Sequence, residues 1–140
     1  MEESLSFLMD KASRAIIYRL QNRFAKSGFD ITVEQAVIMS HLWKENGSSQ
    51  QKIANRLGKD KATVSGIITS LEKKDLIVRV PGETDKRQRR IFLTNTGKKM
   101  QTNLEPMIFE NLDYAEQSII PEHIEICKTV LRTIIKRLKT

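Results

Sequence analysis

A short loop in the second half of the chain concentrates side chains that could bind a polyanion. Four cations fall within five residues and one carboxylate precedes them: Asp85, Lys86, Arg87, Arg89 and Arg90. The flanking segments 77–80 and 91–93 are rich in β-branched and aromatic residues, which predicts two paired strands with the loop at their tip. Like charges crowded at a hairpin tip repel one another, so the pattern favours a negatively charged partner.

The charge of the whole chain is distributed just as unevenly. The 140 residues carry a net charge of +7. Segment 52–99 holds 13 Lys and Arg against 5 Asp and Glu, a net +8, and the remaining residues hold 11 against 12, a net −1. A localised positive excess is typical of a module that binds nucleic acid. Basic surfaces also bind membranes and acidic proteins, so charge alone leaves those partners open.

The residues just upstream of the loop form two short helical patterns separated by a turn. Gly58 suits the turn because glycine adopts the left-handed backbone without a steric penalty, and Asp60 suits the N-cap of the second helix. Ser48 and Gln51 have the spacing of a capping box at the start of the first helix. The order helix, turn, helix and basic hairpin predicts a winged helix-turn-helix that binds DNA.

The second of these helices is expected to bury one face and to offer the other to DNA. The buried set is Ala62, Ile67, Ile68 and Leu71. The outward set is Lys61, Thr63, Ser65, Gly66, Thr69 and Lys73. Small polar side chains let a helix approach base edges closely, and lysines meet phosphate. Most amphipathic helix pairs bind no DNA, so it is the basic hairpin directly after this pair that favours DNA binding.

Two longer helices are expected on either side of this region. Thr32 and Gln35 form a capping box that predicts a helix ended by Gly47. Thr94 is expected to cap another long helix, which contains Pro106. A proline inside a helix removes one hydrogen bond and clashes with the preceding turn, so we expect a kink or break just before it.

Helical patterns at the two ends of the chain flank the basic region. The first, at about residues 3–25, carries apolar residues on more than one face and is expected to bury them. The last opens at Pro121, a favoured first-turn residue, and repeats apolar residues every three or four positions. These stripes could pack within one chain, but 140 residues cannot easily bury both. We expect them to pair two copies as a homodimer. The residues expected in the interface are Leu5, Leu8, Ile124, Leu131, Ile134 and Leu138.

These features together resemble the MarR family of bacterial transcription regulators over nearly the whole chain. The resemblance rests on segment 60–65, which opens the second helix of the helix-turn-helix, and on segment 71–79, which leaves it. It rests also on the wing pattern Asp85-x-Arg87-x-x-Arg90 and on the pattern Leu93-Thr94-x-x-Gly97 behind it. The implied fold is mainly α with a small β-hairpin wing. Residues 1–140 would form one domain, in which 32–94 are the winged helix-turn-helix and 1–28 and 98–140 the dimerisation helices.

The resemblance implies a ligand-responsive regulator, a repressor that binds double-stranded DNA as a homodimer at a pseudo-palindromic operator. Recognition helices would enter the major groove and wing arginines the minor groove, with a small aromatic or phenolic effector binding between the dimer and DNA-binding regions. Arg87 is then the minor-groove residue, Asp85 orients it, and Arg90 braces the hairpin or meets phosphate. The residues implied in DNA binding are Lys61, Thr63, Ser65, Thr69, Lys73, Asp85, Lys86, Arg87, Arg89 and Arg90. The cations expected near the DNA surface are Lys61, Lys73, Arg79, Lys86, Arg87, Arg89 and Arg90.

The chain departs from the family pattern at two positions. Gly66 stands where many members carry a larger, often basic, residue in the recognition helix. Asp75 stands where glycine is usual after that helix, and an aspartate can adopt the left-handed turn at modest cost.

Other classes of function find less support in the sequence. No phosphate-binding glycine loop, metalloprotease helix or serine elbow is present, so no enzyme and no cofactor are expected. His41 and His123 lie in no cluster with metal-ligand spacing, and nothing in the sequence brings a serine to His41. The alternative that remains is a helical adaptor whose basic face binds an acidic protein.

Four more side chains are expected in the core. Phe24, Met39 and Trp43 could line a ligand pocket but fit a packed core better, and Cys127 on the last apolar stripe is expected to be a buried structural thiol.

A single cysteine cannot form an internal disulfide, and no apolar run reaches the roughly 20 residues of a membrane span. The N-terminus also lacks the pattern of a signal peptide. We therefore expect a cytoplasmic protein.

Overall fold

The computed structural model describes residues 3–85 and 88–139. The described elements are α1 (Leu5–Lys26), α2 (Val33–Lys44), α3 (Gln50–Leu57), α4 (Lys61–Lys73), β1 (Ile77–Pro81), β2 (Arg89–Leu93), α5 (Asn95–Lys99), α6 (Gln101–Glu116) and α7 (Pro121–Leu138). This order confirms the predicted fold, mainly α-helical with one small antiparallel hairpin.

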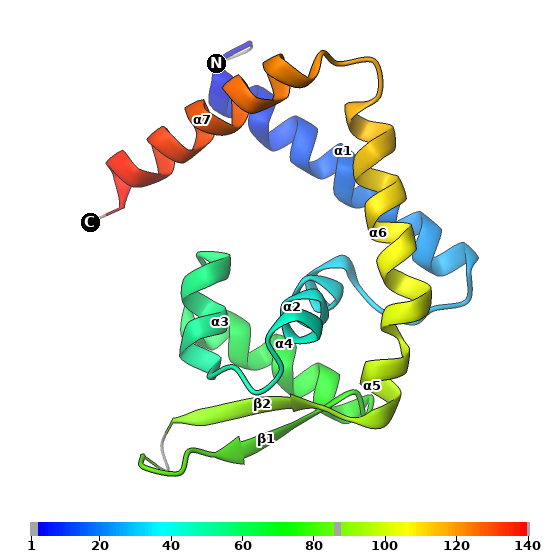
Figure 1. Cartoon of the computed structure of the whole chain (residues 1–140), viewed down its shortest axis with the longest axis vertical. Helices are drawn as coiled ribbons and strands as arrows, with labels where there is room; N and C mark the ends of the chain where they lie inside the picture. Colours follow the sequence, from blue (N-terminus) through cyan, green and yellow to red (C-terminus); the bar gives the residue numbers. More distant parts are fainter. Residues whose placement is uncertain (1–2, 86–87, 140) are drawn as a thin grey trace.

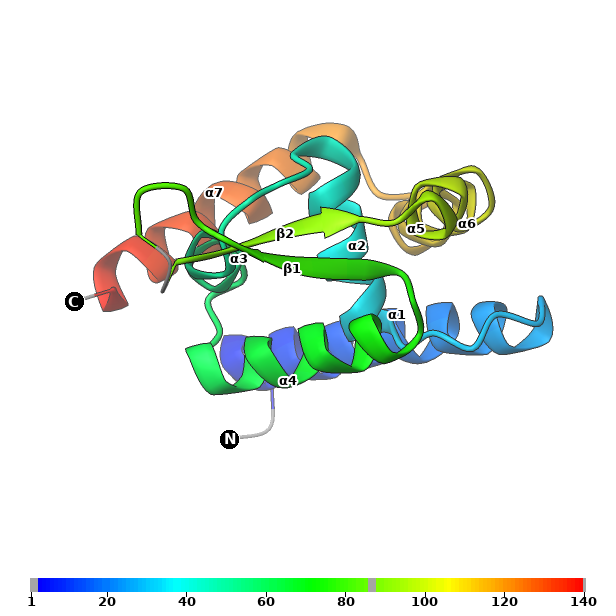
Figure 2. The ribbon, with the colours of Figure 1, turned by 90° about the horizontal axis from the view of Figure 1, so that it is seen from below.

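The elements divide into two parts that α6 connects. In Figure 1 the lower part holds α2, α3, α4 and the hairpin, and the upper part holds α1, α7 and most of α6. Figure 2 looks onto the lower end, where the hairpin crosses in front of α2 and α3 and α4 runs beside it, in front of α1. Among the described residues, no helix combines the length and the apolar character needed to cross a bilayer.

The hydrophobic core lies almost wholly in the lower part. Its members are Leu20, Phe24, Ile31, Val33, Ala36, Ile38, Met39, Leu42, Ile53, Ala54, Val64, Ile68, Leu71, Leu76, Ile77, Ile91, Leu93, Leu104 and Met107. From α1 only Leu20 and Phe24 are buried, and α7 buries no residue at all. The expectation that the first helix buries more than one face is therefore wrong for the described residues of a single chain, which bury no side chain in the N-terminal half of α1.

Local capping decides where most helices begin. Thr32 and Gln35 form the predicted capping box of α2, and Gly58 takes the predicted left-handed backbone with φ 64°. The predicted capping box at Ser48 is wrong, because Ser49 is the N-cap of α3 and accepts from the backbone N–H of Lys52. The Ser48 hydroxyl points inward instead and donates to the Glu45 carbonyl.

Of the kink or break predicted just before Pro106, the break is wrong. The helix after the hairpin divides at Met100, between α5 and α6, and α6 continues through Pro106 without interruption. A proline forfeits one backbone hydrogen bond, and burial of Leu104 and Met107 on its two sides holds the helix in place.

Candidate nucleic-acid interface

The recognition helix α4 begins at a well-bonded aspartate. Asp60 accepts from the Thr63 backbone N–H at 2.8 Å and from its hydroxyl at 2.9 Å. Both bonds favour the charged carboxylate and lower the pKa of Asp60 below its usual range. The carboxylate also complements the positive end of the helix dipole. The Thr63 hydroxyl, predicted to meet DNA, is thus partly engaged by the cap.

The outward face of α4 differs from the predicted one in which residues it exposes. Val64, Ile68 and Leu71 fill the buried side, and Ile67 is half-buried. Ala62, predicted to be buried, is exposed, because it lies one helical turn before exposed Gly66 on the same face. The exposed residues of α4 are Lys61, Ala62, Thr63, Gly66 and Lys73.

Arg79 of β1 fastens the recognition helix to the hairpin. Its guanidinium donates to Glu72 at 2.8 Å, to the Ser65 carbonyl at 2.8 Å and hydroxyl at 3.1 Å, and to the Thr69 hydroxyl at 3.0 Å. A further bond at 3.3 Å reaches Gln50 of α3. The side chain is only 13% exposed. The placement of Arg79 among the DNA-facing cations is therefore wrong, since its donors are committed within the chain.

This clamp also changes the status of two residues predicted to contact DNA. The hydroxyls of Ser65 and Thr69 both accept from Arg79, and both residues are half-buried between α4 and β1. Sequence reasoning missed the clamp because its members are separated by 7 to 29 residues, a distance at which no local spacing rule applies.

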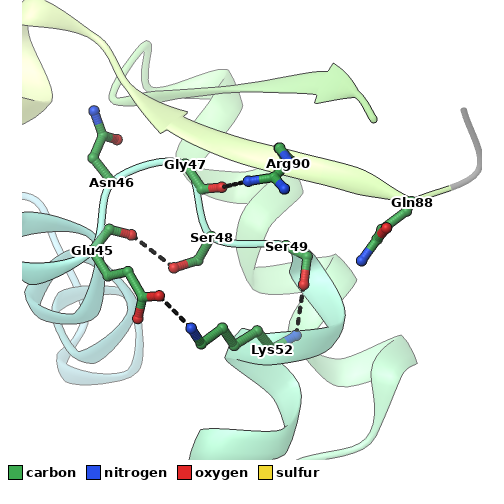
Figure 3. A pocket seen from close by; sticks show the side chains of 8 residues that line it. All are labelled: Glu45, Asn46, Gly47, Ser48, Ser49, Lys52, Gln88 and Arg90. Atoms are coloured by element: carbon green, nitrogen blue, oxygen red, sulfur yellow. Dashed lines mark hydrogen bonds and ion pairs between the residues drawn. The ribbon is translucent and has the colours of Figure 1, made fainter. Parts of the chain in front are cut away.

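The hairpin has the predicted strands and a third partner. β1 pairs with β2 from Ile77 opposite Leu93 to Pro81 opposite Arg89. The turn before α3 joins the sheet, because Ile91 N–H donates to the Ser48 carbonyl and Gly47 N–H to the Ile91 carbonyl, each at 2.9 Å. The Arg90 guanidinium donates to the Gly47 carbonyl at 3.1 Å, as Figure 3 shows. This contact is the bracing role predicted as one of two for Arg90.

The tip of the wing is tight and exposed. A Cβ on Gly82 would lie 2.5 Å from the Asp85 carbonyl oxygen, so only glycine lets the chain close there. The Asp85 carbonyl accepts from the Gln88 N–H at 3.0 Å, and Asp85 and Arg89 are both exposed. Lys86 and Arg87 lie outside the described residues, so their predicted contacts with DNA stay predictions.

The pattern behind the wing fixes the base of the hairpin. A Cβ on Gly97 would come within 2.2 Å of the Leu76 carbonyl oxygen, so α5 can pack here only with glycine. Thr94 N–H donates to that same carbonyl at 3.0 Å, and the Thr94 hydroxyl donates to the Asp75 carbonyl at 2.7 Å. Asp75 itself has φ 60°, which confirms the left-handed turn predicted for it.

A groove brings the parts of the predicted DNA surface together. Lys61 at the start of α4 shares it with Arg89 of the wing. Its other lining residues are Gln50, Gln51, Asp85 and Gln88. The surface thus joins the N-terminus of α4 to the hairpin, with a lysine from one and an arginine from the other in its lining.

Comparison with known proteins identifies this arrangement. The MarR family model matches residues 31–88. The HTH-type transcriptional regulator MgrA of Staphylococcus aureus is 29% identical over 104 residues, which are 74% of this chain and 70% of MgrA. The S. aureus MepR–DNA complex superimposes with a TM-score of 0.87 and 27% identity, covering 98% of this chain and 100% of that one. Residues 31–88 of this chain belong to the MarR family of transcriptional regulators.

The likeness in fold extends to a ligand-bound structure. CouR from Rhodococcus jostii RHA1, bound to p-coumaroyl-CoA, superimposes with a TM-score of 0.82 at 16% identity, covering 99% of this chain and 96% of that one. At this identity the comparison concerns the fold, which in both proteins is the winged helix-turn-helix with flanking helices.

The regulator has an apolar pocket between its two parts. The pocket encloses about 280 Å³ and is lined from α1, α2, α3 and α6. Its lining residues are Leu20, Val33, Ala36, Val37, Ser40, His41, Lys44, Arg56, Leu57, Glu105, Ile108 and Phe109. Phe24 and Met39 lie in the core instead, as expected, and Trp43 packs against it with its indole N–H donating to the Gly97 carbonyl at 3.0 Å.

His41 lines this pocket and also contacts the turn before α3, which is hydrogen-bonded to the wing. Its Nε2 lies 2.9 Å from the Ser48 hydroxyl, a proximity that the sequence did not reveal. Because Ser48 donates its only proton to the Glu45 carbonyl, His41 must be the donor, which leaves no basic nitrogen facing the serine. Burial lowers the pKa of His41, and the cations Arg56 and Lys52 lower it further against the opposing Glu45 carboxylate.

Around Ser48 a second, polar pocket is closed by paired charges. Lys52 forms an ion pair with Glu45, and the hydrogen bond from Lys52 lowers the pKa of that carboxyl. Figure 3 shows both side chains on one side of the turn, with Arg90 on the other. The pocket therefore lies where α2, α3 and the wing meet, and the bond from Arg90 to the Gly47 carbonyl links the wing to the turn.

The residues predicted for dimerisation are all exposed or half-buried in the single chain. Leu5 is 52% exposed and Leu138 is 73% exposed, while Ile124, Leu131 and Ile134 are half-buried. Cys127, predicted to be buried, is exposed, because no residue of α7 is buried by the single chain.

Within the upper part, α1 and α6 are nevertheless held together by several polar contacts. Arg19 of α1 donates to both Glu110 oxygens, at 3.0 and 3.2 Å, and to Asn111 Oδ1 at 2.8 Å. Asn111, buried in α6, donates to the Ile16 carbonyl at 3.1 Å, and the Arg19 guanidinium lies over the Tyr114 ring at 3.9 Å. The hydrogen bonds and charges of this crossing raise the pKa of Arg19 and lower the pKa of Glu110.

Proposed function

We propose that this regulator is a homodimeric repressor that binds a pseudo-palindromic operator, with α4 in the major groove and the hairpin tip in the minor groove. The observation that carries the proposal is the groove in which Lys61 of α4 faces Arg89 of the wing. Arg79 holds these two elements in fixed relation. A rigid pair of this kind spans a phosphate backbone between two grooves, which is the geometry of winged helices on DNA.

The proposed contacts divide by chemistry. Lys61, Lys73 and Arg89 would meet phosphate, and Arg87, oriented by Asp85, would enter the minor groove. Lys86 would add charge at the tip, and Arg90 would act through the Gly47 carbonyl. Thr63, Ser65 and Thr69 would face the bases with hydroxyls that already have partners in the chain. Such a protein works where DNA is, so we propose a cytoplasmic location.

The dimer is supported by apolar surface that the single chain leaves open. Residues 1–28 and 98–140 would form the dimerisation region, and 32–94 the DNA-binding region. The stripe Ile124, Leu131, Ile134 and Leu138 on α7 would pack with Leu5 and Leu8 of α1 across a two-fold axis. Burying these side chains against a second copy removes apolar area from water, which favours association.

The pocket between the two parts is the proposed effector site. Its volume of about 280 Å³ lies near the lower end of small-molecule sites, which suits a single aromatic or phenolic ring. Arg56 and Lys44 could meet an acidic group on that ring, beside apolar Val37 and Phe109. An effector that binds here would separate the upper part from α3, and thereby weaken DNA binding. The CouR complex offers a precedent, since that protein binds p-coumaroyl-CoA.

Fluorescence anisotropy with a duplex selected from random sequences tests the proposed surface. Lys61→Ala and Arg89→Ala should each weaken binding about tenfold at low salt, and less at high salt. Lys26→Ala removes the same charge from the exposed end of α1, away from the groove, and should leave the affinity unchanged. An adaptor for an acidic protein would bind no duplex, and equal effects of all three variants would rule out this groove.

A further inference from the structure

We infer that α4 reads thymine methyl groups in the major groove, through close approach of its backbone at Gly66. The inference rests on the proposed function, because that function places α4 in the major groove. It adds the chemical class of base pair that the helix recognises and the residue that permits the reading.

Gly66 differs from the other five glycines of the chain. Gly28, Gly47 and Gly58 have positive φ, and Gly82 and Gly97 sit where a Cβ would collide with backbone oxygens. At Gly66 a Cβ would meet no described atom within 4 Å, and φ is not positive. Neither backbone strain nor packing among the described residues therefore accounts for this glycine.

A glycine in the middle of an exposed helix destabilises the fold relative to alanine. Gly66 lies near the centre of α4, far from both ends, where such a residue weakens the helix most. Its useful property there is the absence of a side chain on the outward face. That absence matters only to a partner that approaches the helix backbone more closely than a Cβ would permit.

The neighbours of Gly66 on the same face have short side chains, and one of them is already hydrogen-bonded within the chain. Ala62 is one turn before it and Thr69 one turn after it, which places all three in one row along the helix. The Ala62 side chain is a single methyl group. The Thr69 hydroxyl accepts from Arg79 at 3.0 Å, so one of its acceptor positions is already used, and the rest of the side chain is a single methyl group.

The rest of α4 offers few of the side chains that read purine edges. Bidentate recognition of guanine or adenine uses arginine, lysine, asparagine or glutamine. Segment 61–73 contains no arginine, asparagine or glutamine, and its two lysines stand at the helix ends. Glu72, which could accept from cytosine, is bound to Arg79. The hydroxyls of Thr63, Ser65 and Thr69 can bond to either kind of base and so discriminate little. The group that Gly66 brings close is the helix surface beside the Ala62 methyl, and the C5 methyl of thymine is the apolar group of the major groove.

Replacing thymine by deoxyuridine tests this inference directly, because uracil lacks only the methyl group. The probe is the duplex selected for the proposed function, with each half-site thymine replaced in turn. At one or two positions per half-site the wild-type protein should lose about fivefold in affinity. No loss at any position, with binding otherwise intact, would overturn the inference while the proposed function stands. Failure to bind any duplex would instead overturn the proposed function.

The variant Gly66→Ala tests the role of the missing side chain. It should raise the melting temperature by about 3 °C, because alanine favours the helix, and still weaken binding at least tenfold. It should also lose the preference for thymine over deoxyuridine at the sensitive positions. Lys73→Gln on the same helix is the control and should weaken binding to both duplexes equally. Unchanged affinity of Gly66→Ala, or a retained thymine preference, would overturn the role of Gly66.

Discussion

The lower and upper parts of this regulator differ in how far a single chain buries their apolar side chains. In the winged helix-turn-helix, Ile53, Ile68 and Leu71 are fully buried, and the polar groups of the wing are tied to α3 and α4. In α7 no residue is buried, and Ile126 is 62% exposed. One part buries its core within a single chain, whereas the other leaves an apolar surface exposed. This difference supports the proposal that the first part contacts DNA and the second part forms the dimer.

The largest expected effect comes from a charge on the α7 stripe. Leu131→Asp or Ile134→Asp should yield monomers or insoluble protein, because an unpaired carboxylate in an apolar interface costs several kcal/mol. Thr129→Asp, on the side of α7 opposite the stripe, is the matched control and should remain dimeric. Sedimentation velocity measures the outcome. Unaltered dimers of both stripe variants would mean that the interface lies elsewhere.

The next effect concerns the clamp inside the lower part. Arg79→Ala should destabilise the fold by about 2 kcal/mol, because it leaves Glu72 without its charged partner. It should also weaken operator binding at least tenfold without removing any DNA contact. Arg79→Lys keeps the charge but cannot reach Ser65, Thr69 and Glu72 together, so it should recover little. Full affinity of the lysine variant would mean that Arg79 contributes only its positive charge and not its several hydrogen bonds.

A comparable or smaller effect is expected at the wing tip. Arg87→Ala should cost about 1–3 kcal/mol in operator binding with folding intact, if Arg87 enters the minor groove. Asp85→Ala should weaken binding too, although it removes a negative charge near DNA and simple electrostatics predicts the opposite sign. Tighter binding by the Asp85 variant, measured by anisotropy, would exclude the orienting role.

The smallest effect is a pH dependence centred on His41. Its pKa lies below 6.5 in the folded protein, so the unfolded chain takes up a proton first as the pH falls. Stability is then greatest above pH 6.5 and declines as the pH falls through that value. His41→Gln should show a shallower decline between pH 7.5 and 5.5 in chemical denaturation. A wild-type protein equally stable at both pH values would contradict the buried, neutral histidine.

The sequence predicted those features whose causes are local. Thr32, Gly58 and Asp60 were assigned correctly because a cap or a left-handed turn depends on residues within three or four positions. The choice between Ser48 and Ser49 was wrong because contacts of Ser48 with Glu45 and His41 decide it. The same limit explains Arg79, whose side-chain partners come from α3 and α4, and the pocket, which is lined from four helices. Exposure of Cys127 could not be read from its apolar stripe, because a stripe does not say which chain covers it.

The salt dependence of operator binding tests the central claim, that two such chains bind DNA together through this basic surface. With Arg79 committed inside the chain, six of the cations predicted to contact DNA are left for each protomer: Lys61, Lys73, Lys86, Arg87, Arg89 and Arg90. If about half meet phosphate, the dimer makes about six contacts, and log affinity should fall against log salt with a slope of about −5. The selected sites should be inverted repeats with half-site centres about 10 base pairs apart. A slope near −2, or selection of a single asymmetric site, would show that one chain binds alone and would contradict the account.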